Sequence, residues 1–176
     1  MSPYDAHFTC VLDAGGGLVL RPLAHADMPA ILAMFADDDV ARWWTSPPEE
    51  IADIIDEPSV WPYLVSLDGA PIGYFQIYHA NPEPFWADFG VPPETFGLDM
   101  FLTVQGKGLG TRMVRTAIAH IWRAPRASRI QIDPDPDNPR AIRAYEKAGF
   151  VARGAMPGYE GAAMLYMTID KTGETP

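Results

Sequence analysis

The stretch from Gln105 to Gly110 has the composition of a loop that binds an anion through its backbone. It reads Gln-Gly-Lys-Gly-Leu-Gly, and its glycines let the main chain approach a ligand with no Cβ in the way. A helix pattern follows at about 109–123, and the free N–H groups and positive dipole end of such a helix favour a pyrophosphate. On the turn alone, a tight strand-to-helix connection without a ligand fits equally well.

Asp99 is a carboxylate at a position where a carboxylate is costly. It interrupts the sequence FGLDMFL, on a strand that reads as apolar on both faces. A carboxylate there must be paired or functional. It could accept a proton from a substrate ammonium or hold that cation, or it could be a structural group satisfied by backbone donors. Asp133 ends the next expected strand and is either a second carboxylate for a polyamine or an acid of the turn.

Hydrophobic periodicity and turn residues predict an α/β domain with a mixed sheet around these residues. Strands are expected at 8–12, 18–22, 60–67, 72–79, 96–104, 129–133, 150–155 and 163–169. Helices are expected at 28–35, 50–57, about 109–123 and 138–148. The last helix has the clearest boundaries, because Asn138 suits an N-cap, Pro139 the first turn and Gly149 the residue after the end.

Residues 80–95 are rich in proline and acid, which predicts a loop, and loops of this length are often functional lids. No linker or internal repeat divides the 176 residues. We therefore expect a single domain over 1–176, with about 171–176 as a flexible tail.

The formal net charge of −10 disfavours nucleic acid as a partner, because its binders carry basic patches. It would attract a cationic small molecule if the acids gather around a cleft, or it could simply keep the protein soluble. The sequence contains no run of about 18 apolar residues, and so it predicts no membrane span. A single cysteine, Cys10, and the lack of a signal-peptide pattern favour a cytoplasmic location.

Two motifs about thirty residues apart carry a resemblance to a known family. The pattern Gln/Arg-x-x-Gly-x-Gly/Ala is matched by Gln105, Gly108 and Gly110. The pattern Asn-x-x-Ala-x-x-x-Tyr-x-x-x-Gly-Phe is matched by Asn138, Ala141, Tyr145, Gly149 and Phe150. The chain thus resembles the GNAT superfamily of acyl-CoA-dependent N-acyltransferases.

The resemblance implies a fold and a reaction. The GNAT fold has a central, mostly antiparallel twisted sheet of six to seven strands, splayed between its fourth and fifth strands and flanked by about four helices. The reaction would be acetyl transfer from acetyl-CoA by direct attack in a ternary complex, without an acyl-enzyme and without a metal. Cys10, the only thiol, lies far from both motifs.

The resemblance also implies where CoA would lie. The backbone of Gln105–Gly110 would hold the pyrophosphate, and the edge of the fourth strand, around Phe101–Thr103, would pair with pantetheine. The cofactor-binding residues implied are Phe101, Leu102, Thr103, Gln105, Gly106, Lys107, Gly108, Leu109, Gly110, Thr111 and Asn138. Lys107 and Arg112 could contact phosphates or be solvated surface charges, and Asn138 could be only the cap of its helix.

The two catalytic residues implied are Asp99 and Tyr145. In this family the tyrosine is the usual general acid for the leaving thiolate, and a phenol with a pKa of about 10 can serve that role. Otherwise Tyr145 would be a core residue with a hydrogen-bonded hydroxyl. Asp99 would be the base or the anchor for the amine.

A closer similarity is to the aminoglycoside 6'-N-acetyltransferases, through LRPL, Trp43-Trp44, Pro71-Ile-Gly-Tyr74, Gly97-Leu-Asp99 and Asp133-Pro-x-Pro-x-Asn138. It implies a small polycationic amine as the acceptor. The substrate-binding residues would be Trp44, Tyr63, Trp86, Asp99 and Asp133. Alternatives are a hydroxylysine siderophore precursor or a protein N-terminus as acceptor, and a non-catalytic acyl-CoA-binding regulatory domain. Monomer and homodimer are both left open.

Overall fold

The computed structural model describes residues 2–81, 84–87, 89–158 and 162–171. Its strands form one sheet in the order β1-β2-β3-β4-β5-β6-β8-β7. The strands are β1 (Leu12–Asp13), β2 (Leu18–Pro22), β3 (Val60–Leu67), β4 (Ala70–His79), β5 (Thr95–Leu102), β6 (Arg129–Ile132), β7 (Val151–Pro157) and β8 (Ala163–Asp170). The helices are α1 (Asp5–Phe8), α2 (Met28–Met34), α3 (Asp38–Trp43), α4 (Glu50–Ile54), α5 (Pro84–Ala87), α6 (Leu109–Ile121) and α7 (Pro139–Ala148), and a 3-10 turn covers His25–Asp27.

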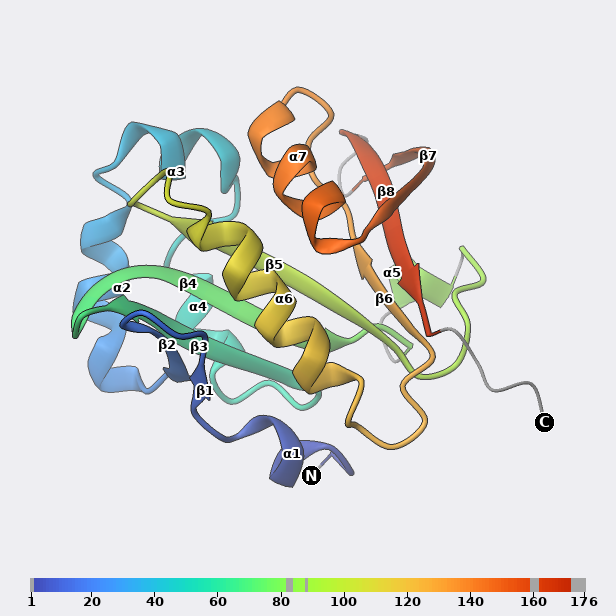
Figure 1. Ribbon diagram of the computed structural model, residues 1–176, viewed down its shortest axis with the longest axis horizontal. Helices are drawn as coiled ribbons and strands as arrows, with labels where there is room; N and C mark the ends of the chain where they lie inside the picture. The colour runs from blue at the N-terminus through green and yellow to red at the C-terminus, as the bar shows by residue number, and fades with distance from the viewer. Residues whose placement is uncertain (1, 82–83, 88, 159–161, 172–176) are drawn as a thin grey trace.

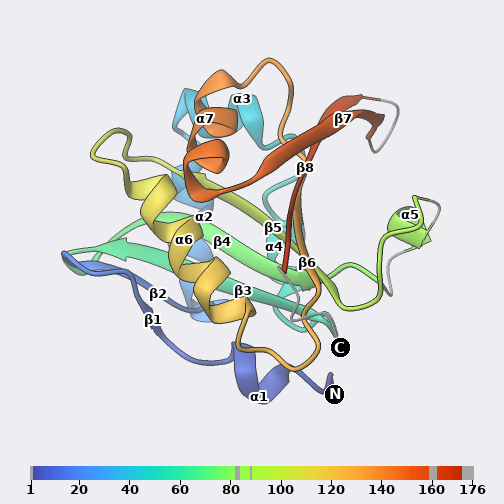
Figure 2. The ribbon, with the colours of Figure 1, turned by 45° about the vertical axis from the view of Figure 1, so that its right-hand side comes forward.

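The sheet opens between β5 and β6, which are its one parallel pair of neighbours among the described strands. Their ladder extends only over Thr95–Gly97 on β5, opposite 129–131 on β6. β5 continues to Leu102 beside β4, whereas β6, β8 and β7 turn away from it, as Figures 1 and 2 show. The parting leaves the second half of β5 with an edge that no strand of the described chain covers.

Each face of the sheet carries a buried core. On one face, α6 lies across the strands (Figure 1) and packs against side chains such as Val65, Phe75 and Leu98. On the other face, α2, α3 and α4 pack against Leu64 and other alternate residues of the strands. The side chains that α6 buries recur at helical spacing, which is why this segment is a helix on a sheet: Leu109, Met113, Val114, Ala117, His120 and Ile121.

The helix α7 begins and ends at the residues that the sequence predicts. The Asn138 side chain accepts a hydrogen bond from the Ala141 N–H at 3.1 Å, and Pro139 occupies the first turn. Gly149 ends the helix with a φ of 111°, a conformation that favours glycine. These two boundaries fix α7 above the opening between β5 and β6, where its side chains line a cleft.

Several predictions about the elements are wrong. The sheet has eight strands among the described residues, the number that the residue patterns predict, whereas the resemblance implied six to seven. The expected strand at 8–12 is shorter, since Tyr4 and Phe8, spaced four apart, are buried on one side of the helix α1. Helices also outnumber the expected four or so, because the short α1, α3 and α5 lack a clear periodic pattern.

The expected loop at 80–95 contains the helix α5, and its end already belongs to β5. Of the expected tail, residues 172–176 lie outside the described residues. In the parts of the chain that the structure describes, no helix is long and apolar enough to cross a membrane.

Candidate active site

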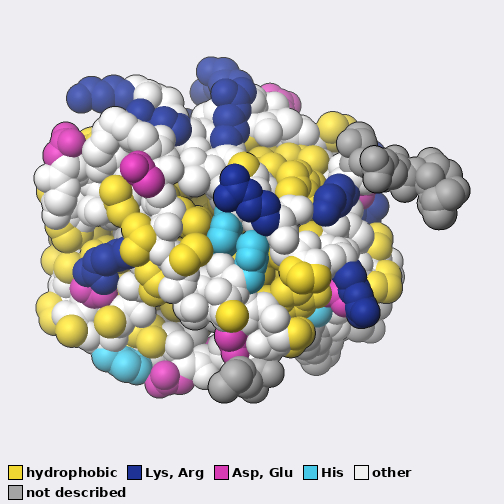
Figure 3. Space-filling model, turned by 60° about the horizontal axis from the view of Figure 1, so that its bottom comes forward, with side chains coloured by type: hydrophobic (Ala, Val, Ile, Leu, Met, Phe, Trp, Pro, Cys, Tyr) yellow, Lys and Arg dark blue, Asp and Glu magenta, His cyan; other side chains and the backbone are white. Residues whose placement is uncertain are grey.

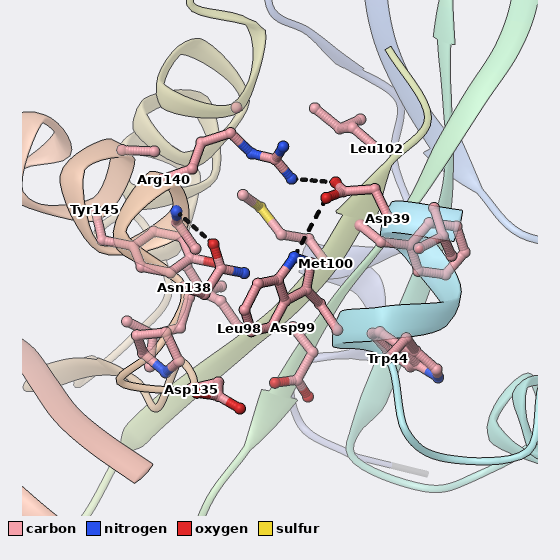
Figure 4. A pocket seen from close by; sticks show the side chains of 18 of the residues that line it. Asp39, Trp44, Leu98, Asp99, Met100, Leu102, Asp135, Asn138, Arg140 and Tyr145 are labelled. Atoms are coloured by element: carbon pink, nitrogen blue, oxygen red, sulfur yellow. Dashed lines mark hydrogen bonds and ion pairs between the residues drawn. The ribbon is translucent and has the colours of Figure 1, made fainter. Parts of the chain in front are cut away.

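A cleft of about 640 Å³ lies where the two halves of the sheet part. Its walls come from α3, the second half of β5, the loop before α6, the residues after β6, and α7. Figure 4 shows side chains from these segments converging on one space. Because the parting of β5 from β6 exposes main-chain groups in a wall of the cleft, an extended amide-containing ligand could pair with β5 there.

The glycine loop at one end of the cleft has the backbone of an anion site. Gly106, Lys107 and Gly108 all have positive φ, at 84°, 52° and 67°. A Cβ at Gly106 or Gly108 would meet nothing within 4 Å, so glycine is favoured there by the backbone conformation and leaves open space for a ligand. The first turn of α6 follows at once, with N–H groups that have no partner within the helix.

Asp99 ends a chain of hydrogen bonds that runs across two strands. The Tyr74 hydroxyl donates to Gln76 Oε1 at 2.5 Å, and Gln76 Nε2 donates to Asp99 Oδ2 at 2.6 Å. Gln76 and Asp99 are register partners on β4 and β5, which explains why they meet. Sequence reasoning missed Tyr74 and Gln76, because only the register of the sheet brings them to the carboxylate.

Asp99 and Asp133 form an interacting pair of carboxylates in the cleft. Burial raises the pKa of Asp99 to about 6, and the Gln76 hydrogen bond opposes this rise. Burial, together with the charge of Asp99, raises the pKa of Asp133 to about 7. Both residues keep partial access to solvent. Since each charge disfavours the other, the two titrate as a pair near neutral pH, where a bound cation would favour both charges.

Tyr145 faces these carboxylates from α7 and is 6% exposed. Burial raises the pKa of its hydroxyl well above the usual value, and the charges of Asp99 and Asp133 add to the rise. The phenol therefore stays protonated and can act as a proton donor.

A second network crosses the cleft and was not predicted. Asp39 Oδ2 accepts a hydrogen bond from Gln105 Nε2 at 2.7 Å and forms an ion pair with Arg140 of α7 (Figure 4). Asp39 Oδ1 accepts a hydrogen bond from Trp43 Nε1 at 3.3 Å. These contacts join α3, the glycine loop and α7, three segments that are far apart in the sequence, so no local pattern could indicate them.

The structure brings most of the proposed site residues to the cleft. Those that line it are Trp44, Asp99, Phe101, Leu102, Gln105, Gly106, Gly108, Leu109, Gly110, Thr111, Asp133, Asn138 and Tyr145. Trp44 packs edge-on against Tyr74 and Phe101, with ring centroids 5.4 and 5.3 Å apart. The roles of all these cleft-lining residues toward ligands stay predictions.

Four proposed residues are not among those that line the cleft. Thr103 hydrogen-bonds back to the Ile72 carbonyl, and Lys107 is exposed on the loop. Tyr63 is fully buried and donates its hydroxyl to the Phe8 carbonyl. Trp86 is 1% exposed and packs in a separate cluster that includes Tyr78 and Ala80. For all four residues, contact with a ligand stays a prediction.

The fold and the site together define a class of protein. A parallel strand pair that parts beside a glycine loop and a helix start, with a tyrosine on the next helix, is the arrangement of acyl-CoA-dependent N-acyltransferases. The match to a family model agrees: residues 24–157 match the acetyltransferase (GNAT) domain. The chain belongs to this family.

Similar proteins cover nearly the whole chain. An aminoglycoside N(6')-acetyltransferase type 1 from Klebsiella pneumoniae is 31% identical in an alignment of 174 positions that covers 91% of this chain and 86% of that protein. A crystal structure of the aminoglycoside acetyltransferase AAC(6')-Ib with coenzyme A and kanamycin has a TM-score of 0.78 and 32% identity, covering 88% of this chain and 95% of that one. A spermidine N(1)-acetyltransferase from Escherichia coli (strain K12) is 26% identical over 147 residues, covering 78% of this chain and 74% of that protein.

Proposed function

We propose that the protein transfers an acetyl group from acetyl-CoA to a primary amine of a small polycation, and that this acceptor is an aminoglycoside acetylated at its 6'-amine. The observation that carries the proposal is the pair of carboxylates, Asp99 and Asp133, in one cleft with the glycine loop. A protein that only bound acyl-CoA would gain nothing from two half-buried acids that repel each other. The relatives named for aminoglycoside acetylation support the choice of acceptor.

The carboxylates favour a polycation on electrostatic grounds. An amine enters as an ammonium, and its charge offsets the mutual repulsion of Asp99 and Asp133. A second ammonium of the same acceptor could pair with the other carboxylate. Trp44, beside them in the cleft, offers a flat apolar face to a sugar ring or cation.

The proposed mechanism assigns a donor and an acceptor to each proton that moves. Asp99 takes a proton from the ammonium, either directly or through water, and frees the nitrogen lone pair. The nitrogen then attacks the thioester carbonyl carbon and the C–N bond forms. The nitrogen, positively charged after the attack, loses a second proton to water, and the C–S bond breaks as the tetrahedral carbon collapses to the neutral amide. Tyr145 gives its hydroxyl proton to the departing thiolate and regains one from solvent. No side chain becomes acylated.

Acetyl-CoA would be held by main-chain groups. The N–H groups from Gly106 to Gly110 suit the pyrophosphate, and the open edge of β5 suits the amides of pantetheine. We also propose a cytoplasmic location, where acetyl-CoA is made and the exposed thiol of Cys10 stays reduced.

The test is a thiol-release assay with acetyl-CoA and a panel of amines. The panel contains two aminoglycosides that differ only in a 6'-amino or 6'-hydroxyl group, together with spermidine, hydroxylysine and a peptide with a free N-terminus. We expect turnover of the 6'-amino compound and none of its 6'-hydroxyl partner. Exclusive turnover of hydroxylysine or the peptide would overturn the aminoglycoside assignment. CoA binding without turnover of any amine would overturn the enzymatic function.

A further inference from the structure

Asp39, in the first turn of α3, contacts three segments that border the cleft. Its Oδ2 accepts a hydrogen bond from Gln105 Nε2 of the glycine loop at 2.7 Å and forms the ion pair with Arg140 of α7. Its Oδ1 accepts the indole N–H of Trp43, the last residue of α3, at 3.3 Å. Both carboxylate oxygens therefore have partners, and one side chain connects the glycine loop, α7 and both ends of α3.

The contacts of Asp39 bridge the open edge of β5. The helix α3 packs on one face of the sheet through Val40. The helix α7 lies beside α6 on the other face, where Thr111 Oγ1 donates to the Ala144 carbonyl at 3.3 Å. The ion pair therefore passes from one face to the other across the second half of β5 (Figure 4). Among the described residues, every hydrogen bond and ion pair between α3 and the glycine loop or α7 ends on Asp39.

Asp39 also lies between the two ends of the cleft. The glycine loop, which carries Gln105, forms the end proposed for the cosubstrate. At the other end, Trp44 follows α3 and packs edge-on against Tyr74. The hydroxyl of Tyr74 leads through one glutamine side chain to Asp99. The helix α3 thus ends beside the residues proposed for the acceptor, while its first turn is tied to the cosubstrate loop.

The bridge can form and open at small cost. The side chains of Arg140 and Asp39 are 48% and 29% exposed, so water can replace either partner. On the face of the molecule that Figure 3 shows, several Lys and Arg side chains lie at the surface with no Asp or Glu side chain beside them. Because ion pairs at such exposure contribute little on their own, a ligand that holds one partner in place can shift the balance between the formed and the open bridge.

We propose that Asp39 is a positioning residue that couples the two ends of the cleft, so that cosubstrate and acceptor strengthen each other's binding. This inference rests on the proposed function for the identity of the two ligands. A pyrophosphate on the N–H groups that follow Gln105 fixes the loop and so favours the bond from Gln105 to Asp39. An acceptor against Trp44 fixes α3 and favours the same bond from the other side. Because α7 carries Tyr145, the state with both ligands bound is also the one that holds the general acid in place.

Hydrogen exchange tests the coupling without any acceptor. CoA is added to the protein, and mass spectrometry follows exchange in a peptide that covers α3. We expect CoA to slow this exchange about fivefold or more in wild type and to have no effect on it in Asp39→Ala. A purely structural Asp39 would instead speed up exchange in both states and leave the effect of CoA intact. Asp38→Ala is the matched control, since it removes the same charge from the same turn, from an exposed residue outside the cleft lining.

Equilibrium binding measures the coupling itself. Isothermal titration calorimetry gives the dissociation constant of CoA alone and with a saturating 6'-amino aminoglycoside, and CoA has no acetyl group to transfer. In wild type and Asp38→Ala, we expect the aminoglycoside to strengthen CoA binding about fivefold or more, and CoA must strengthen aminoglycoside binding by the same factor. The factor should fall toward one in Asp39→Ala and with rising salt. Arg140→Gln should lower it in part, which keeps the coupling testable if Asp39→Ala does not fold.

The outcomes separate this coupling from the proposed function. An effect of CoA on α3 that is absent in wild type, or that survives Asp39→Ala, would overturn the coupling. Direct attraction between a cationic acceptor and an anionic cosubstrate would likewise give a binding factor that survives Asp39→Ala. Turnover of an aminoglycoside whose affinity does not change with CoA would overturn the coupling and keep the function. An effect of CoA on α3 that requires Asp39, in a protein that acetylates no aminoglycoside, would support the coupling and overturn the acceptor assignment.

Discussion

The hydrogen bond from Gln76 to Asp99 gives a prediction with a calculable size. Gln76→Leu keeps much of the side-chain volume but removes the amide that donates to Asp99 Oδ2 at 2.6 Å. Hydrogen bonds to charged groups contribute about 1.5–3 kcal/mol. Since about 1.4 kcal/mol corresponds to one pKa unit, losing the bond should raise the pKa of Asp99 by roughly one to two units.

The direction of the effect on activity follows from the role of Asp99 as a base. The carboxyl must be ionised to work, so activity is lost as the pH falls through its pKa, which burial has raised to about 6. In Gln76→Leu this midpoint should move to roughly 7–8. Turnover at about pH 6, where about half of the wild-type base is ionised, should therefore fall roughly 5- to 50-fold, while turnover at about pH 9 should change little.

The measurement is kcat/KM for the preferred amine, by thiol release, between about pH 5.5 and 9. Tyr74→Phe removes only the hydroxyl that holds Gln76, so its midpoint should shift in the same direction by less. Gln131→Leu is the matched control, because Gln131 is a buried glutamine bonded to Tyr166 rather than to Asp99. A Gln76→Leu profile that overlays the wild-type profile would refute the assignment of Asp99 as the base.

Three further predictions follow from other contacts. Tyr145→Phe should lower kcat by about 10²–10⁴ and leave the dissociation constant of CoA unchanged, and equal kinetics in the two proteins would return Tyr145 to a structural role. Asp133→Asn should stabilise the fold by an amount that grows between about pH 4 and 7 and reaches a few kcal/mol above about pH 7, because the carboxyl ionises in the unfolded chain at a lower pH than in the fold. Thermal melts at about pH 5 and 8 should therefore show the larger gain at the higher pH. The rings of His7 and His120 stack with centroids 4.2 Å apart, and burial lowers the pKa of His120 to about 4. Because His120 takes up a proton more readily in the unfolded chain, the free energy of unfolding should fall as the pH drops from about 6.5 to 4. In thermal melts over this range, His120→Gln should remove much of the pH dependence.

Local signals in the sequence were sufficient for much of the framework. The glycine loop, the cap at Asn138 and the boundary at Gly149 are dictated by backbone conformation, which a few adjacent residues determine. Strand β3 was predicted without error because Asp68-Gly69 fixes the turn that follows it. The helix α1 was missed since a single turn gives too short a pattern to separate a helix from a strand.

The parts of the site that depend on distant contacts could not be read from the sequence. Gln76 meets Asp99 only through the register of β4 and β5, and Asp39 meets Arg140 across 101 residues of chain. Tyr63 is the reverse case. The resemblance places it beside the substrate, whereas its side chain lies in the buried core, and its contact with a ligand stays a prediction.

The cost of the site explains why its acceptor should carry several positive charges. Two interacting carboxylates with raised pKa values destabilise the folded protein wherever both are ionised. An acceptor with one ammonium can compensate one carboxylate, but the other stays half-buried without a cation beside it. An acceptor with two suitably spaced ammonium groups compensates both, lowers both pKa values and displaces protons from the pair. Its binding near pH 6 should therefore release protons to the buffer and strengthen as the pH rises toward 8, whereas a neutral acceptor would show neither effect.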